Sequence, residues 1–193
     1  MNVSEKIVEE YLNQLEKLNS NKPIQYVMGT SNFYGNDYIV NEHTLIPRFE
    51  TEELVENTIK YINKYFNYPI DIIDLGTGSG IIGLTLEKKV STNIVDLVDI
   101  SKEALEVTKK NKELLNSKAN LIESDFFNSI NNKYDVIISN PPYIKENEEI
   151  QDLVKNNEPH LALYAGSDGL DCYRKIISTV KPHLNNHYLK NPH

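Results

Sequence analysis

From residue 70 onward the sequence alternates short runs of branched apolar residues with longer stretches whose apolar positions recur at helical spacing. The apolar runs predict strands at 70–75, 93–98, 120–122 and 134–139. The helical stretches are 81–89, 101–115, with Ser101 as the expected N-cap, and 168–180. Because strands that alternate with helices pair in parallel through right-handed crossovers, this pattern predicts an α/β fold with a doubly wound parallel sheet. In such a sheet the carboxyl ends of the strands share one edge, where ligand sites form.

Two further helices are predicted before the alternation begins. Apolar residues in 3–18 recur every three or four positions, which is typical of one amphipathic helix. Thr51 is the expected N-cap of a helix over 52–66, which carries acidic residues in its first turn. At the other end, 182–193 shows neither the helical nor the strand period. We therefore expect the sheet to be incomplete at the C-terminus, with an unpaired edge beside 134–139.

A β-hairpin is predicted between the first two helices. Segments 25–29, 32–34 and 38–40 are rich in aromatic and branched residues, and the last two flank the turn 35–37, Gly-Asn-Asp. The segment 46–49, Ile-Pro-Arg-Phe, follows as a loop because its proline lacks a backbone N–H.

Composition sets the broad class of the protein. The 193 residues are 39% apolar and 25% charged, as in ordinary globular domains. The formal net charge of −8 argues against extended nucleic-acid contact, so we expect a protein partner and no direct nucleic acid. No apolar stretch is long enough for a membrane span, and the first residues lack a signal-peptide core. We expect a cytoplasmic monomer that does not bind membranes.

The sequence gives little support for a metal site or a reactive cysteine. Cys172 is the single cysteine, which excludes an internal disulfide and a thiolate zinc site. It lies on a predicted helix, where we expect a small buried apolar side chain. The five histidines are scattered, and His183 and His187 have no glutamate or cysteine partner at ligand spacing. No metal site is predicted.

A glycine-rich turn joins the first strand of the sheet to its helix, with the sequence Asp74-Leu75-Gly76-Thr77-Gly78-Ser79-Gly80. Glycines allow a sharp turn and a close ligand approach. The spacing is G-x-G-x-G, whereas dinucleotide enzymes carry G-x-G-x-x-G. Asp74 precedes the glycines, where a carboxylate repels a pyrophosphate but attracts an ammonium group. S-adenosylmethionine carries such an amino group and no phosphate, so the turn predicts a site for this cofactor.

Polar residues after the next two strands extend the predicted cofactor site. Asp99 ends the second strand, where a carboxylate can accept both ribose hydroxyls. Ile100 can then cover one face of the adenine. After the third strand, Asp125 can accept from the adenine amino group and Phe126 can pack on the ring. Taken singly, Asp125 and Phe126 could also be an ordinary loop residue and an ordinary core residue. Compatible groups at four strand ends, in the right order along the chain, favour the cofactor.

The fourth strand ends at Asn140-Pro141-Pro142-Tyr143. Neither proline can donate to a strand ladder, so the chain must leave the sheet as a stiff turn. The turn offers carbonyl and amide oxygens that can accept from a planar NH2 group, and an aromatic ring that can pack on it. This tetrapeptide resembles the signature loop of methyltransferases that act on amide or exocyclic amine nitrogens. The alternative is a turn without a binding role, in which the prolines end the strand and the tyrosine lies on the surface.

With these residues assembled, the chain resembles the HemK/PrmC family, the N5-glutamine methyltransferases of peptide chain release factors. The similarity covers about residues 22–181 and is carried by the glycine turn, the Asn140 turn and several further segments. These are 25–29, 33–35, 45–52 (Leu-Ile-Pro-Arg-Phe-Glu-Thr-Glu), 158–163 (Glu-Pro-His-Leu-Ala-Leu) and 168–170. The resemblance implies a Rossmann-like class I methyltransferase fold and a release factor as partner.

The resemblance also implies roles for the turn residues. Asn140 Oδ1 and the Pro141 carbonyl would accept the two N–H groups of a glutamine amide, and Tyr143 would position the amide plane. Asn140, which borders the cofactor as well, Pro142 and Arg48 complete the expected substrate contacts. The amide nitrogen would then attack the methyl group of the sulfonium, and no side chain is required as a general base.

Three departures from the family pattern bear on the domain organisation. Phe49 stands where the family usually has a second proline. The expected division is 1–22 as a remnant of the family's N-terminal helical domain, 23–48 as a hairpin linker, and 49–193 as the methyltransferase domain with its C-terminal strands missing. Two alternatives stay open: an adenine-N6 type methyltransferase of nucleic acids, which needs a basic channel, and a non-catalytic truncated remnant.

Overall fold

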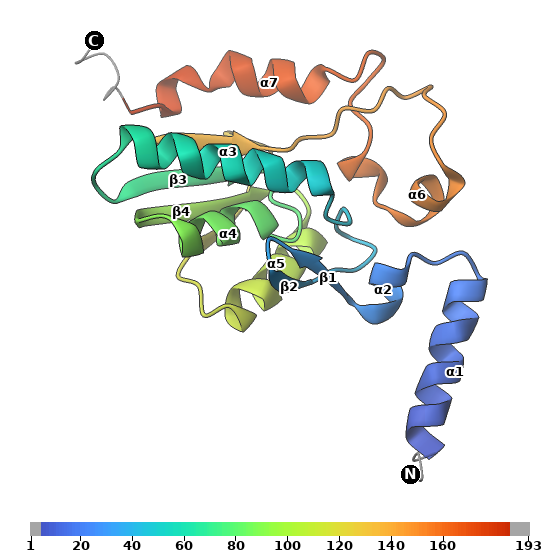
Figure 1. Cartoon of the computed structure of the whole chain (residues 1–193). Helices are drawn as coiled ribbons and strands as arrows, with labels where there is room; N and C mark the ends of the chain where they lie inside the picture. The colour runs from blue at the N-terminus through green and yellow to red at the C-terminus, as the bar shows by residue number, and fades with distance from the viewer. Residues whose placement is uncertain (1–4, 186–193) are drawn as a thin grey trace.

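The computed structural model describes residues 5–185 of the chain, and its centre is a parallel sheet of four strands (Figure 1). The strands are β3 (Ile70–Leu75), β4 (Thr92–Asp99), β5 (Asn120–Glu123) and β6 (Val136–Ser139), in the order β5-β4-β3-β6. Every neighbouring pair is parallel. The predicted α/β fold is therefore confirmed. The strand order reverses between β3 and β6, and a crevice at such a reversal is where open α/β sheets bind ligands.

Helices cover both faces of the sheet. The helices after the hairpin are α3 (Phe49–Tyr65), α4 (Ile81–Lys89), α5 (Lys102–Leu114), α6 (Asp152–Asn157) and α7 (Asp171–Thr179), of which α6 lies apart from the strands (Figure 1). Alternate residues of β3 point to opposite faces, as a strand requires. Ile70 and Ile72 pack with α3 and α4, whereas Ile73 and Leu75 belong to a second cluster that Ile176 of α7 joins.

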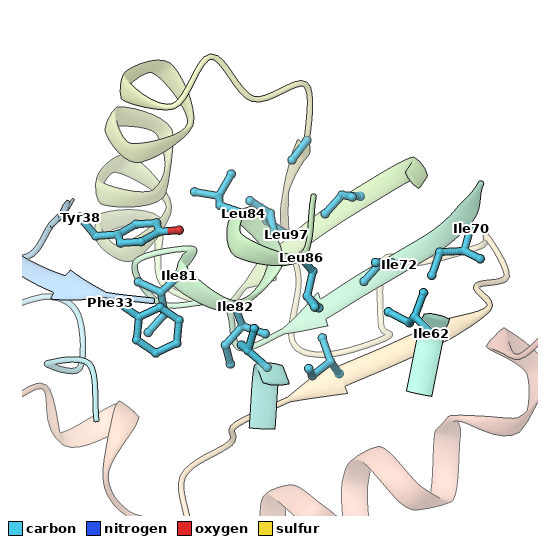
Figure 2. Packing of buried hydrophobic residues seen from close by; sticks show 14 residues of the cluster. Phe33, Tyr38, Ile62, Ile70, Ile72, Ile81, Ile82, Leu84, Leu86 and Leu97 are labelled. Carbon is cyan, nitrogen blue, oxygen red and sulfur yellow. The ribbon is translucent and has the colours of Figure 1, made fainter. Parts of the chain in front are cut away.

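A β-hairpin packs against α4 and α5 and closes the first cluster. It consists of β1 (Thr30–Phe33) and β2 (Asn36–Ile39), so the predicted hairpin is confirmed. The turn predicted at 35–37 was wrong, because Asn36 pairs with Phe33 and leaves Tyr34-Gly35 as the turn. Figure 2 shows the rings of Phe33 and Tyr38 reaching from the hairpin toward Ile81 and Ile82 of α4. The Tyr38 hydroxyl lies 2.7 Å from Thr85 Oγ1, which satisfies a buried polar group. The hairpin is thus part of the core that supports the sheet.

Several predicted boundaries were wrong. Residues 25–29, predicted as a strand, form the short helix α2 (Ile24–Met28), because Pro23 fixes its entry and Gly29 ends it in the left-handed region at φ 72°. The N-cap of α3 is Arg48, so Thr51 lies inside the first turn and is buried. Ser101 does cap α5, since its side chain accepts from Ala104 N at 3.1 Å. The short helix α6 was not predicted.

The two ends of the described chain differ in packing. Helix α1 (Glu5–Asn19) confirms the predicted amphipathic helix, and it extends away from the sheet (Figure 1). Most of its apolar residues are exposed: Ile7, Val8, Tyr11, Leu12 and Leu15. At the other end, Lys181–His183 forms a 3₁₀ turn, and Leu184 makes a parallel bridge with Tyr134. The predicted unpaired edge is therefore bridged at Tyr134, while β6 is the last strand of the sheet among residues 5–185. Residues 186–193 of the predicted irregular stretch lie outside the described residues.

Candidate functional site

The glycine turn between β3 and α4 has the backbone that its sequence predicts. Gly76, Gly78 and Gly80 have φ values of 68°, 59° and 83°, in the region that glycine adopts most readily. At Gly80 a Cβ atom would lie 2.7 Å from Thr108 Cγ2 and 2.9 Å from Leu84 Cδ1, so a side chain there would have to displace the side chains of Thr108 and Leu84. The turn therefore requires glycine both for its conformation and for its packing.

Asp74 holds this turn from behind. Its side chain is fully buried, and Oδ2 accepts hydrogen bonds from Thr77 Oγ1 at 2.7 Å and from Gly83 N at 3.0 Å. Burial raises the pKa of Asp74 to about 6, although both hydrogen bonds act to lower it. Oδ1 has no hydrogen-bond partner within residues 5–185. A carboxylate oxygen with unused acceptor capacity therefore lies beneath the turn.

Asp99, at the end of β4, supports the same turn from the side. Its Oδ2 accepts from Gly78 N at 2.8 Å and its Oδ1 accepts from Ser101 N at 2.9 Å. Burial raises the pKa of Asp99, while the hydrogen bonds from the Ser101 and Gly78 amides oppose this shift. Each carboxylate oxygen can accept a second hydrogen bond, so Asp99 can still receive two ligand hydroxyls.

A cavity of about 350 Å³ opens at these strand ends. The predicted cofactor residues in its wall are Gly76, Thr77, Gly78, Ser79, Asp99, Ile100, Asp125, Phe126 and Asn140. Asp74 and Gly80 are not in the wall: Asp74 lies behind the turn, and Gly80 ends the turn at the start of α4. The structure thus brings together groups from four strand ends, as the sequence predicts for one ligand site.

The amino-terminal part of α7 forms a wall that sequence reasoning missed. Asp171, Cys172 and Lys175 line the same cavity as the glycine turn. Lys175 Nζ forms an ion pair with Asp125 Oδ2 and lies 5.7 Å from the centre of the Phe126 ring. Lys175 therefore holds the two residues predicted to contact an adenine. Cys172 is partly exposed rather than fully buried, and desolvation raises the pKa of its thiol.

A second cavity of about 540 Å³ adjoins the first. Five residues line both cavities: Leu45, Arg48, Thr51, Asn140 and Ala162. Tyr143 lines only the second cavity, and 61% of its side-chain surface is exposed. Pro142 lines the first cavity, and the buried Pro141 is in neither wall. The Asn140 turn therefore stands at the boundary between two spaces.

One ion pair joins two segments that are 110 residues apart. Glu158 is almost fully buried; its Oε1 pairs with Arg48 Nη2 and its Oε2 accepts from Ile46 N at 3.0 Å. Arg48 is about one-third exposed at the cavity boundary. Sequence analysis singled out both segments but did not pair them. The available signal was the single arginine among the apolar residues 45–49 and the single acidic residue of 158–163.

Neither a metal-binding cluster nor a membrane-spanning helix is found among residues 5–185. No group of three or more histidine, cysteine, aspartate or glutamate side chains there is arranged to hold a metal ion. Within the same residues, no helix combines the length and apolar character that crossing a bilayer requires.

Comparisons with known proteins define the family. The profile described as the methyltransferase small domain matches residues 52–162. A release factor glutamine methyltransferase from Bacillus cereus is 39% identical over 190 residues, which cover 93% of this chain and 67% of that protein. The chain belongs to the release factor glutamine methyltransferase family. A second member, from Streptococcus pneumoniae, is 42% identical and matches 88% of this chain and 60% of its own length. The chain thus spans 60% to 67% of the length of these two relatives.

Solved structures support the fold of this family member. A methyltransferase from Pyrococcus furiosus matches 90% of this chain and 74% of its own length, with a TM-score of 0.55 and 19% identity. A ribosomal protein L11 methylase from Lactobacillus delbrueckii subsp. bulgaricus matches 80% of this chain and 65% of its own, with a TM-score of 0.51 and 20% identity. At these identities the likeness establishes the Rossmann-like methyltransferase fold alone.

Proposed function

We propose that this chain transfers a methyl group from S-adenosylmethionine to the side-chain amide nitrogen of a glutamine in a peptide chain release factor. The observation that carries the proposal is the meeting of two cavities at Asn140. The first has the residues for the cofactor, and the second receives the amide. The names of the family members support the choice of substrate. Because release factors act in translation, the proposed reaction takes place in the cytoplasm. We also propose that the chain acts as a monomer.

The first cavity fits the cofactor. S-adenosylmethionine, when bound, supplies an electrophilic methyl group on a sulfonium. Asp99 would accept from the ribose hydroxyls, and Ile100 and Phe126 would flank the adenine. The free oxygen of Asp125 would accept from the adenine amino group, since its other oxygen is paired with Lys175. Asp74, which lies behind the turn, would favour the amino group of the cofactor through its charge.

Residues at the second cavity would orient a weak nucleophile, the amide nitrogen, and stabilise the charge that develops on it. An amide nitrogen has a delocalised lone pair, so its attack depends on orientation and on stabilising the positive charge that develops on it. Asn140 Oδ1 and the Pro141 carbonyl would accept the two N–H groups. Tyr143 would pack on the amide plane from the second cavity. The product can lose its proton after transfer, so no base is needed.

We also propose three functional segments along the chain. Residues 49–193 form the methyltransferase domain, 23–48 form a hairpin linker, and 1–22 belong to an N-terminal helical region. The hairpin is bonded to the domain, since Ile39 N donates to Asn111 Oδ1 at 2.7 Å and Asn111 Nδ2 donates to Ile39 O at 2.9 Å. It would therefore hold the loop that carries Arg48 at the boundary of the two cavities.

Transfer of a labelled methyl group tests the proposed function. Purified chain and labelled S-adenosylmethionine are incubated with a release factor, with the same factor lacking its acceptor glutamine, and with DNA and RNA. Label is expected only in the intact release factor. Label in nucleic acid alone would replace the proposal with the amine methyltransferase alternative, and label in no acceptor, with the cofactor bound, would favour a non-catalytic protein.

A further inference from the structure

The side chain of Asn140 meets one hydroxyl group at the boundary of the two cavities. Its Nδ2 donates to Thr51 Oγ1 at 3.4 Å. Among the hydrogen bonds of residues 5–185, this is the single one that the Asn140 side chain makes. Thr51 is only 6% exposed, lines both cavities, and lies in the first turn of α3.

The orientation of this side chain decides what it can do. An asparagine amide has an acceptor end and a donor end, and its terminal torsion is broad and roughly two-fold. Turned by half a revolution, Asn140 would present N–H groups to a substrate NH2 group, and the acceptor would be lost. In the structure Thr51 Oγ1 accepts from Nδ2, and this arrangement leaves Oδ1 free for the substrate.

Other polar neighbours are already engaged. The hydroxyl of Ser139 donates to Leu75 O at 2.7 Å, and Arg48 is paired with Glu158. The same Glu158 holds Ile46 N, so the loop before α3 has a fixed course. Thr51 N in turn donates to Arg48 O at 3.1 Å, which ties the threonine to that loop. The backbone position of Thr51 is therefore set by contacts that do not involve Asn140.

We propose that Thr51 is a positioning residue for methyl transfer: its hydroxyl holds the Asn140 amide with Oδ1 directed at the substrate nitrogen. This inference rests on the proposed function and adds a residue to it. Thr51 itself needs no contact with the substrate or with the methyl group. Its effect should be on turnover, because the acceptor that it orients stabilises charge formed during transfer.

A matched pair of variants tests the inference. Thr51→Val keeps the shape and removes the hydroxyl, whereas Thr51→Ser keeps the hydroxyl and removes a methyl group. We expect Thr51→Val to lower kcat about tenfold, the effect of one hydrogen bond. The KM for release factor and the affinity for S-adenosylhomocysteine should change less than about twofold. Thr51→Ser should keep kcat within about twofold of the unsubstituted chain, and melting curves check that both variants are folded.

A second measurement is independent of the methyl acceptor. With asparagine labelled by ¹⁵N, the side-chain amide signals of Asn140, assigned by their loss in Asn140→Ala, report its hydrogen bond. They should be unchanged in Thr51→Ser and shifted toward free-asparagine values in Thr51→Val. Unchanged signals in Thr51→Val, or equal losses of kcat in the two variants, would overturn the inference. If the unsubstituted chain does not methylate release factor, the proposed function fails, while the amide signals still decide whether Thr51 holds Asn140.

Discussion

At the scale of single residues, main-chain groups fix the polar side chains around the first cavity. Asp74 and Asp99 each accept from a backbone amide of the glycine turn or the helix after it, so removal of either would loosen the turn as well as any ligand contact. Asn140 differs, because its side chain bonds to another side chain and keeps its oxygen free. Its substitution should therefore affect chemistry more than architecture.

Asn140→Ala should reduce turnover by about 10² to 10³, the usual effect of removing a preorganised group that stabilises transition-state charge. Affinity for the cofactor should change only modestly. Asn140→Asp keeps an acceptor and should retain partial activity, which makes it the matched control. Single-turnover methyl transfer, together with calorimetry for cofactor binding, measures the two effects. Transfer by Asn140→Ala at the rate of the unsubstituted chain would contradict the mechanism.

The location of a site residue could be predicted from the sequence where that residue stands at the end of a strand. A parallel sheet brings strand ends together, so Asp99, Asp125 and Asn140 could be placed at one edge from their order alone. The partners of these residues could not be predicted. Lys175 lies 50 residues after Asp125, on α7, which covers the face of the sheet opposite α3 and α4. From the sequence, many other lysines could equally well be the partner of Asp125.

At the scale of elements, strands and helices with strong periodicity were placed well. β3 and α4 have the predicted bounds because branched apolar runs and a glycine turn mark them clearly. Residues 25–29, most of which lie in α2, were predicted as a strand because they include Tyr26 and Val27, which strands favour. A proline before α2 and a left-handed glycine after it, which outweigh that preference, produce one helical turn instead.

The ion pair between Arg48 and Glu158 ties α3 to the segment after α6. We expect Glu158→Gln to lower the free energy of unfolding by about 2 kcal/mol. This is less than for a fully buried pair, because Arg48 is one-third exposed and can be hydrated. Turnover should fall too, since the loop also sets the position of Thr51. Denaturant unfolding measures the first effect, with the exposed Glu146→Gln as control. Equal stability of the two variants would show that the pair does not stabilise the fold.

At the scale of the whole molecule, the buried charge of Asp74 should appear in the pH dependence of stability. Its pKa is about 6 in the folded chain and 3.8 in the reference state, so the folded chain holds this proton more tightly. Asp74 therefore costs stability as pH rises from about 4 to about 6. Asp74→Asn removes that cost, which is at most about 3 kcal/mol at neutral pH. Without ligand, its stability relative to the unsubstituted chain should rise between pH 4 and pH 7.

Melting curves at several pH values test this prediction, because the difference between variant and parent cancels the other carboxyl groups. The exposed Glu106→Gln serves as the control for the loss of one carboxyl group at another position. A constant difference for Asp74→Asn across the range would mean that the carboxyl is not perturbed in the folded chain.

Ligand binding should stabilise the whole chain if the first cavity is a cofactor site. A ligand at a hundred times its Kd raises the free energy of unfolding by about 2.7 kcal/mol when it binds only the folded state. For a chain of this size that corresponds to a rise in Tm of about 5–10 °C. S-adenosylmethionine and S-adenosylhomocysteine should both produce it, and NAD should not, because Asp74 disfavours a pyrophosphate. Asp99→Ala should lose most of the rise, since it removes the acceptor for the ribose hydroxyls. A cooperative melt that neither sulfur ligand shifts would show that the glycine turn does not bind the cofactor.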